Sequence, residues 1–256
     1  MKRWLSYIYK TGSSLADVSK MPEFAPNAPF YAIGDIHGST ALIRKILSKI
    51  EDPPSLCAAV VFLGDYVDRG EDSAGTLAQL YDLSQDDSRP WIFLRGNHEQ
   101  MLLDFLDSPE TAGPFWLMAG GRQTLASFGI GMPWQNMDTK NLPRVRDTLR
   151  EKLGQDLEAW LRQMPLSWKT GNVFLSHAGT DPTLDLEAQS SDTLLWGKTR
   201  GKAGPRADGI WSVQGHVIVD TPQITNGQVF LDTGAYATGI LTAARFDHGK
   251  VDFLST

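Results

Sequence analysis

Residues 30–38, which read FYAIGDIHG, decide the fold. Four apolar residues run directly into Asp35 and His37, which lie between glycines, and this pattern is typical of a buried strand that ends in a tight turn. Residues 58–70 (AAVVFLGDYVDRG) and 91–99 (WIFLRGNHE) repeat the arrangement. We therefore expect three buried strands, each with chemically active side chains directly after its carboxyl end.

The stretches between these three strands have the spacing of amphipathic helices. Residues 39–50 carry apolar side chains three or four positions apart, and residues 72–83 carry leucines in the same way. Strands that alternate with such helices predict a parallel sheet with helices packed on it, hence an α/β fold. Because the carboxyl ends of parallel strands lie along one edge, the polar residues after them should meet in one crevice.

The rest of the chain divides into a lead-in, a helical region and a second set of strands. Residues 1–27 form a polar lead-in, and we place a single domain at 28–256. Residues 100–163 have a mainly helical pattern and are predicted to be an insertion in that domain. Short strand patterns then return, and the C-terminal third is predicted to supply a second sheet. The expected strands are 166–169, 172–176, 210–214, 228–232, 240–246 and 251–254.

Composition excludes several classes of protein. The 256 residues are 41% hydrophobic and 21% charged, so the chain can bury a sizeable core. The net charge of −6 argues against a protein that binds nucleic acid through bulk electrostatics. The single cysteine, Cys57, cannot form a disulfide within the chain or a cysteine zinc site, and its place before a strand predicts a small buried residue.

Neither a membrane span nor a signal peptide is evident in the sequence. No apolar run approaches the ~20 residues that a membrane span requires. The apolar stretch within residues 1–10 is too short for the core of a signal peptide. We therefore expect a cytoplasmic protein without stable membrane association, and a weak surface anchor at residues 1–10 is the alternative.

The placement of the histidines points to a metal site. Imidazoles that share loops with carboxylates and an amide suit a transition metal such as Mn, Fe or Zn rather than Ca or an all-oxygen Mg site. The fifth histidine, His248, lies in the turn sequence DHGK, and we assign it no functional role. The other four each follow a predicted strand in a glycine-flanked loop: His37, His98, His177 and His216.

Three motifs resemble the signature of a known family. GDIHG (34–38), GDYVDRG (64–70) and GNHE (96–99) are similar to the signature motifs of the phosphoprotein phosphatase (PPP) family, which belongs to the calcineurin-like metallophosphoesterases. HAG (177–179) and GH (215–216) resemble the later metal-binding histidines of that family. The compact size resembles the bacterial and bacteriophage-lambda-type members. The resemblance implies a central β-sandwich flanked by helices (αββα), with a helical insertion.

The resemblance also implies a dinuclear metal centre. Two divalent ions, Mn²⁺ with Fe or Zn as alternatives, would hold a bridging hydroxide for direct in-line attack on phosphorus, so that no covalent phospho-enzyme forms. A carboxylate can bridge two cations, and neutral imidazoles add ligands without further charge. The implied ligands are Asp35 and His37 for one ion, Asp65 for both ions, and Asn97, His177 and His216 for the second ion.

Three further residues, together with Asn97, are implied to handle the proton and the phosphate. His98 resembles the general acid of the family, and Asp68 would orient its ring and raise its pKa. Arg69 matches the arginine that grips phosphate oxygens, where a planar guanidinium suits the geometry. Asn97 would contact the phosphate as well as the metal.

A second phosphate-binding arginine is expected from the resemblance but is not at its usual place. Related bacterial enzymes carry it two residues after a tryptophan, and in the stretch LLWGKTR (194–200) that position is Lys198. A lysine cannot chelate phosphate with two parallel hydrogen bonds. We therefore expect Lys198 and Arg200 to share the role.

The implied activity is that of a metal-dependent phosphomonoester hydrolase. A serine/threonine protein phosphatase is favoured by the Tyr66–Arg69 form of the second motif and by Glu99 after His98. Its substrates would be phosphorylated proteins and small phosphomonoesters. A dinucleoside polyphosphate (diadenosine tetraphosphate) hydrolase shares most of these motifs and is the alternative. A non-catalytic metal-binding protein is less favoured because none of the expected ligands is missing.

Overall fold

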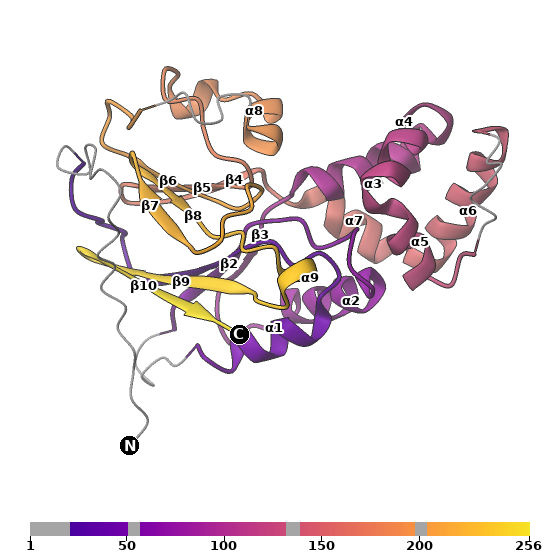
Figure 1. The fold of residues 1–256 in the computed structure, drawn as a ribbon, viewed down its shortest axis with the longest axis horizontal. Coiled ribbons are helices and arrows are strands. Elements are labelled where there is room, and N and C mark those ends of the chain that lie inside the picture. Colours follow the sequence, from indigo (N-terminus) through magenta and orange to yellow (C-terminus); the bar gives the residue numbers. More distant parts are fainter. Residues whose placement is uncertain (1–20, 51–56, 132–138, 198–203) are drawn as a thin grey trace.

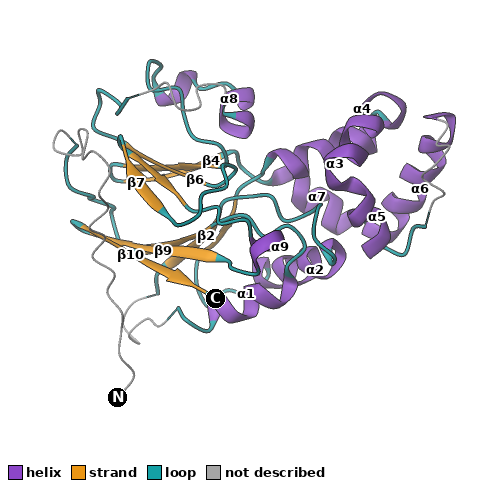
Figure 2. Ribbon diagram, in the orientation of Figure 1, coloured by secondary structure: helices purple, strands orange, loops and turns teal. Residues whose placement is uncertain are grey.

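Two five-stranded sheets pack face to face at the centre of the protein (Figure 1). The computed structural model describes residues 21–50, 57–131, 139–197 and 204–256. Helices cover the outer face of the first sheet, a group of helices extends to one side, and a short helix lies above the second sheet (Figure 2). This arrangement confirms the expected αββα fold with its helical insertion.

The first sheet is mixed, with the strand order β10-β9-β1-β2-β3. β1 (Phe30–Ile33), β2 (Ala59–Phe62) and β3 (Trp91–Phe93) run parallel, as the alternation of strands and helices predicts. β9 (Thr242–Asp247) and β10 (Lys250–Ser255) extend the sheet in the antiparallel direction, with β9 next to β1.

The prediction that the strands of the C-terminal third supply the second sheet is therefore wrong for β9 and β10. The reason lies in the layer between the two sheets. Phe246 of β9 lies opposite Phe30 of β1, and the two rings stack with centroids 4.7 Å apart. An apolar strand pattern shows that a strand is buried, but it does not say which sheet receives it.

The second sheet has the order β4-β5-β6-β8-β7. Its three inner strands run parallel, and an antiparallel strand closes each edge. The shortest edge strand, β7, lies in a stretch for which the sequence predicts no strand. The bounds are β4 Ser167–Thr170, β5 Val173–Ser176, β6 Trp211–Gln214, β7 Gln223–Thr225 and β8 Gln228–Phe230.

Two helices follow the first two strands and cover the first sheet. α1 spans Thr40–Leu47 and α2 spans Ser73–Ser84, close to the amphipathic stretches in the sequence. The side chain of Asp72 caps α2 by accepting a hydrogen bond from the backbone N–H of Gly75 at 2.8 Å. Both helices bury their apolar side chains against the sheet, which fixes the loops that precede them.

The region predicted to be helical contains a series of short helices. A π-helical turn at Leu117–Gly121 (η2) interrupts the series, and Gly120 has a φ of 128° there. Among the described helices, none combines the length and the apolarity that a bilayer crossing requires. The helices are α3 Asn97–Asp107, α4 Pro109–Trp116, α5 Arg122–Ser127, α6 Leu142–Leu153 and α7 Gln155–Gln163, followed later by α8 Ser191–Trp196 and α9 Ala235–Thr238.

Both faces of β1 are buried, in two separate apolar layers. Phe30 and Ala32 point into the layer between the sheets, whereas Tyr31 and Ile33 point toward the helices. This alternation follows from the period of two along a strand, and burial on both faces explains why residues 30–33 are all apolar. The strand therefore holds the loop after Ile33 rigidly between the two layers.

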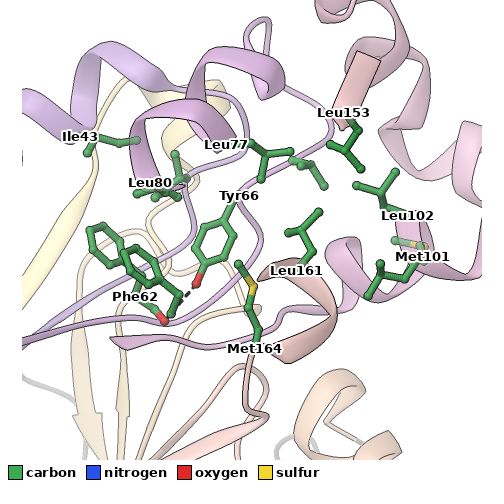
Figure 3. Close-up of a cluster of buried hydrophobic side chains, with 14 of the residues drawn as sticks. Ile43, Phe62, Tyr66, Leu77, Leu80, Met101, Leu102, Leu153, Leu161 and Met164 are labelled. Carbon is green, nitrogen blue, oxygen red and sulfur yellow. Dashed lines mark hydrogen bonds between the residues drawn. The ribbon is translucent and has the colours of Figure 1, made fainter. Parts of the chain in front are cut away.

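The helix-facing layer also anchors the loop after β2. Figure 3 shows Tyr66 among leucines of α2 and α7, including Leu77 and Leu161. The Tyr66 hydroxyl donates a hydrogen bond to the carbonyl of Leu94 at 2.6 Å, so a polar group in the core is satisfied. The GDYVDRG loop is thus fixed from its buried side.

The structure corrects one expectation about a single residue. Cys57 is exposed rather than buried, and its thiol donates to the carbonyl of Ser88 at 2.9 Å. Burial of the apolar run starts one residue later, at Ala58, where the chain enters β2. Residues 1–10, for which a weak surface anchor was the alternative interpretation, lie outside the described residues.

Candidate active site

The carboxyl ends of five strands, taken from both sheets, bring polar side chains to one place. Parallel strands of each sheet point the same way, so the loops after them meet at one end of the sandwich. In chain order these side chains are Asp35 and His37 after β1, Asp65 after β2, Asn97 and His98 after β3, His177 after β5 and His216 after β6.

Asp65 lies at the centre and belongs to two groups of metal-ligand side chains. One group is His37, Asp65 and His98, the other is Asp65, His177 and His216, and within each group the ligand atoms lie within 4.8 Å of one another. Asp65 Oδ2 is 3.4 Å from His37 Nε2, and Oδ1 is 3.2 Å from His177 Nε2. Burial alone would raise the pKa of Asp65, but the surrounding histidines hold it well below its ordinary value.

Asn97 lies beside the second group, and its amide oxygen faces ring nitrogens of both histidines of that group. Asn97 Oδ1 is 2.8 Å from His177 Nε2 and 2.9 Å from His216 Nδ1. The other ring nitrogen of His177, Nδ1, is 3.0 Å from the carbonyl of Leu63 and is placed to donate to it. In the neutral ring this contact leaves a lone pair on Nε2 that points at the Asn97 oxygen. Lone pairs so arranged suit a cation between them, so the side chains fit a divalent metal.

His37 has the same arrangement on the other side of Asp65. Its Nδ1 is 2.7 Å from the carbonyl of Val67 and its Nε2 faces Asp65. Burial lowers the pKa of His37 to about 3, against the attraction of the Asp65 carboxylate, so the ring is neutral at pH 7. A neutral imidazole held through its outer nitrogen is the usual form of a histidine ligand.

Asp35 is buried at this site but belongs to neither group of ligands among the described residues. Its carboxylate accepts the backbone N–H of His216, with distances of 3.1 and 3.0 Å to its two oxygens. The buried carboxylate of Asp232, which the sequence interpretation missed, interacts electrostatically with Asp35. Burial, together with the charges of Asp232 and Asp65, raises the pKa of Asp35 well above its ordinary value.

The backbone of the site is unusual as well. Positive φ angles occur at His37 (45°), Asp65 (54°), Asp68 (71°), Arg69 (64°) and His216 (61°). Within the described residues, these five account for all but one of the non-glycine residues with positive φ. The left-handed region costs energy for a residue with a Cβ atom, and such strain persists where the surroundings fix a functional geometry.

His98 is held by a hydrogen bond through one ring nitrogen, whereas the other faces Asp65 at a longer distance of 3.9 Å. Nδ1 is 2.7 Å from Asp68 Oδ2. Nε2 is buried and makes no hydrogen bond within the part of the chain that the structure describes. Burial alone would lower the pKa of His98, but the carboxylates of Asp65 and Asp68 outweigh it and raise the pKa above its ordinary value. This ring can therefore carry a proton on Nε2 toward a reacting group.

The helical insertion supplies the side chains that hold Asp68. Trp116 Nε1 donates to both carboxylate oxygens, at 3.1 and 3.0 Å, and Thr124 Oγ1 donates to Oδ1 at 2.6 Å. The sequence predicts only that this region is a helical insertion, and no local pattern identifies Trp116 or Thr124 as a partner of Asp68.

Glu99 connects the loop after β2 to the loop after β3 through hydrogen bonds to their backbones. Its Oε2 accepts the backbone N–H groups of Asp65 (2.8 Å) and Gly96 (2.9 Å), and its Oε1 accepts those of Tyr66 (2.7 Å) and Val67 (3.2 Å). Burial and the charge of Asp65 raise the pKa of Glu99 to about 7, although these four N–H groups stabilise the anion. One carboxylate therefore fixes the loop that carries Asp65 to the start of α3.

The comparison with protein families agrees with this geometry. Residues 28–217 match the family model described as calcineurin-like phosphoesterase, a span that contains the side chains described above after β1, β2, β3, β5 and β6. The chain belongs to the calcineurin-like phosphoesterases. It is accordingly a metal-dependent phosphoesterase, and the two histidine–aspartate groups around Asp65 are consistent with a dinuclear metal site.

Two relatives of this phosphoesterase have different activities. It is 27% identical to serine/threonine-protein phosphatase 2 of Salmonella typhimurium over 228 residues, which are 83% of this chain and 90% of that protein. It is 33% identical to a symmetrical bis(5'-nucleosyl)-tetraphosphatase of Legionella pneumophila over 165 residues, 62% of this chain and 47% of that protein. The first relative matches over nearly its whole length, the second over about half.

A solved structure shows the same fold. A crystal structure provisionally assigned as a diadenosine tetraphosphatase has a TM-score of 0.60 with 21% identity, and the match covers 91% of this chain and 98% of that one. At this level of identity the likeness concerns the architecture only.

Arg69 of this phosphoesterase lies at the mouth of the site. Its Nη1 is 3.1 Å from His37 Nε2, and its guanidinium carbon lies 5.5 Å from the centroid of the Tyr236 ring. Tyr236, in α9, was not among the residues singled out from the sequence. The two candidates for a second phosphate contact, Lys198 and Arg200, lie outside the described residues.

Proposed function

We propose that this phosphoesterase is a serine/threonine protein phosphatase that depends on two divalent metal ions. The observation that carries the proposal is the position of Asp65 between His37 on one side and His177 and His216 on the other, with the His98–Asp68 pair beside it. The preference for a phosphoprotein substrate rests on the match to the Salmonella protein phosphatase, which extends over nearly the full length of that relative.

The proposed metal ligands come from both sheets. When bound, the two ions supply an activated water molecule and neutralise charge on the phosphoryl oxygens. Mn²⁺ is the proposed metal, with Fe or Zn as alternatives, because mixed nitrogen and oxygen ligands suit all three. We assign Asp35 and His37 to one ion, Asp65 to both, and Asn97, His177 and His216 to the other.

The remaining side chains bind the phosphoryl group and deliver the proton. Arg69 holds two phosphoryl oxygens with its planar guanidinium, and Asn97 contacts the same group. As the bond from phosphorus to the leaving oxygen breaks, His98 gives its Nε2 proton to that oxygen. Asp68 keeps the Nδ1 proton in place and stabilises the charged ring before the transfer.

Lys198 and Arg200 are proposed to share a second contact to phosphate. The contact is tested by replacing each with alanine and measuring inhibition by inorganic phosphate. Weaker inhibition in one variant assigns the contact to that residue, and unchanged inhibition in both contradicts the proposal.

The second candidate is a dinucleoside polyphosphate hydrolase, which the Legionella relative favours through its higher identity over 165 residues. Steady-state assays on a phosphoserine peptide and on diadenosine tetraphosphate, side by side with Mn²⁺, separate the two. We expect a higher kcat/KM for the peptide. A strong preference for the nucleotide would reverse the order of the two candidates.

A further inference from the structure

A cavity of about 550 Å³ opens directly beside Arg69. Its walls come from the π-helical turn at Leu117–Gly121, from the start of α5 and from Tyr236 of α9. Because Arg69 forms part of its lining, the cavity continues the site at which the reacting phosphoryl group is proposed to bind. A substrate held by Arg69 would therefore extend into this cavity or across its mouth.

The walls of the cavity combine polar and apolar side chains and are open to solvent. Met118 is 81% exposed and Tyr236 is 38% exposed, although both are large apolar side chains. Phe115, one turn before Met118, is 60% exposed, and the side chain of Ile218 packs near Gly234 at the start of α9. Exposed apolar side chains gathered around a catalytic opening indicate a surface that a partner covers.

The charges in the cavity all have one sign. Arg69 and Arg122 are the charged residues of its lining, and no acidic side chain lines it among the described residues. The chain as a whole has a net charge of −6, so this positive opening contrasts with the average surface. A locally positive cleft favours an anionic group that approaches it.

We propose that this cavity, which we call the Met118–Tyr236 pocket, binds an acidic side chain next to the phosphorylated residue of a protein substrate. This inference rests on the proposed function, since it names which phosphoproteins are preferred. The carboxylate lies toward Arg122, and the methylene groups of the same side chain lie against Met118 and Tyr236. Neighbouring Cα atoms are 3.8 Å apart, so a residue one or two positions from the phosphoresidue reaches a cavity that adjoins Arg69.

The test compares phosphoserine peptides that differ at one position. Glutamate, alanine or lysine is placed in turn at the two positions on each side of the phosphoserine, and kcat/KM is measured with Mn²⁺. p-Nitrophenyl phosphate, which has no flanking residues, reports the basal reaction, and diadenosine tetraphosphate is assayed in parallel. At one or more positions we expect the glutamate peptide to exceed the alanine peptide about fivefold, with lysine lowest, as for one ion pair at a solvent-open site.

Arg122→Gln removes one of the two positive charges that line the pocket and leaves Arg69 in place. We expect the preference for glutamate to shrink to within about twofold while turnover of p-nitrophenyl phosphate stays within about twofold of the unmodified protein. Arg144→Gln is the matched control, because Arg144 is an exposed arginine on α6, and α6 lies at the far end of the helical insertion (Figure 1). This variant should keep the full preference.

The outcomes separate this inference from the proposed function. Equal turnover of glutamate and alanine peptides by the unmodified protein overturns the pocket assignment alone. A preference that survives in Arg122→Gln overturns it as well. Hydrolysis of diadenosine tetraphosphate with no turnover of any phosphopeptide overturns the proposed function, and the pocket assignment with it.

Discussion

Proton delivery by His98 depends directly on the carboxylate of Asp68. It is fully buried, and Trp116, Thr124 and His98 surround it. Asp68→Asn keeps the shape but no longer stabilises a charged His98 ring. We expect kcat for a phosphoserine peptide to fall about 10²- to 10³-fold, because general acid catalysis contributes on that order.

A comparison of two substrates shows whether Asp68 acts by supporting proton transfer from His98 to the leaving group. p-Nitrophenolate leaves easily without an acid, so its phosphate ester should lose much less activity in Asp68→Asn than the serine ester does. Elemental analysis should find the metal content unchanged. Equal losses for both esters, or a loss of metal, would mean that Asp68 serves the structure of the loop rather than the proton.

Glu99 is a positioning residue whose effect reaches the metal site through the backbone. A carboxylate can accept all four N–H groups that surround it, whereas the amide of Glu99→Gln would turn an NH₂ group toward two of them. Groups that orient metal ligands in this way typically contribute 10- to 100-fold to metal affinity. We expect a loss of about that size in Mn²⁺ affinity, measured by calorimetric titration.

Glu110 offers the comparison for Glu99→Gln. It is exposed on α4, so Glu110→Gln should bind Mn²⁺ like the unmodified protein. If Glu99→Gln also binds Mn²⁺ normally, the four hydrogen bonds do not position Asp65.

At the scale of the elements, the π-helical turn η2 approaches the Asp68–Arg69 loop through Gly120. A Cβ atom on Gly120 would lie 2.7 Å from the backbone nitrogen of Arg69 and 3.0 Å from the Cβ of Asp68. Gly120→Ala should therefore push the loop away from η2 and displace both side chains. We expect kcat/KM for p-nitrophenyl phosphate to fall at least about tenfold, because small displacements of positioning groups have large kinetic effects.

Gly120→Ala introduces backbone strain as well as a steric clash, and a variant at a second glycine distinguishes the two effects. Gly239, at the end of α9, also has a positive φ (71°), but nothing lies within 4 Å of its Cβ position. Gly239→Ala should lower the free energy of unfolding by about 1 kcal/mol and leave kcat/KM nearly unchanged. If both variants lose activity equally, the approach of η2 to Arg69 is not what matters.

The elements near the site differ in how far the sequence could predict them. The strands β1, β2 and β3 are apolar runs closed by glycine, so the sequence was sufficient to predict them and the loops after them. The contact of Asp68 with Thr124 spans 56 residues, and that with Trp116 spans 48. Such contacts depend on how the helical insertion folds back over the sheet, which no local pattern encodes.

The same limit applies to Asp35 and Asp232. The position of Asp35 after a buried strand is evident in the sequence, but its pairing with Asp232 arises because β8 and β1 belong to sheets that face each other. Sequence periodicity gives the face of a strand and not its neighbour across the sandwich. Tyr236 was missed for a related reason, since α9 is only four residues long.

At the scale of the whole molecule, the proposed metal centre connects the two sheets. Asp65 and His37 follow strands of the first sheet, whereas His177 and His216 follow strands of the second. Cations bound among these side chains would tie the sheets together at one end of the sandwich. A ligand that binds only the folded protein stabilises it by about 2.7 kcal/mol at a concentration of 100 times its Kd.

Metal removal should therefore lower thermal stability as well as activity. For a chain of this size we expect Mn²⁺ to raise Tm by about 5–10 °C over the chelator-treated protein, measured by scanning calorimetry.

Asp65→Asn removes the carboxylate shared by both ligand groups, so it should lose the Tm shift, the bound metal and nearly all turnover. Asp82→Asn, a change on the exposed side of α2, should retain all three. An active Asp65→Asn enzyme with an undiminished Tm shift would contradict the bridging role, because no other described carboxylate belongs to both groups.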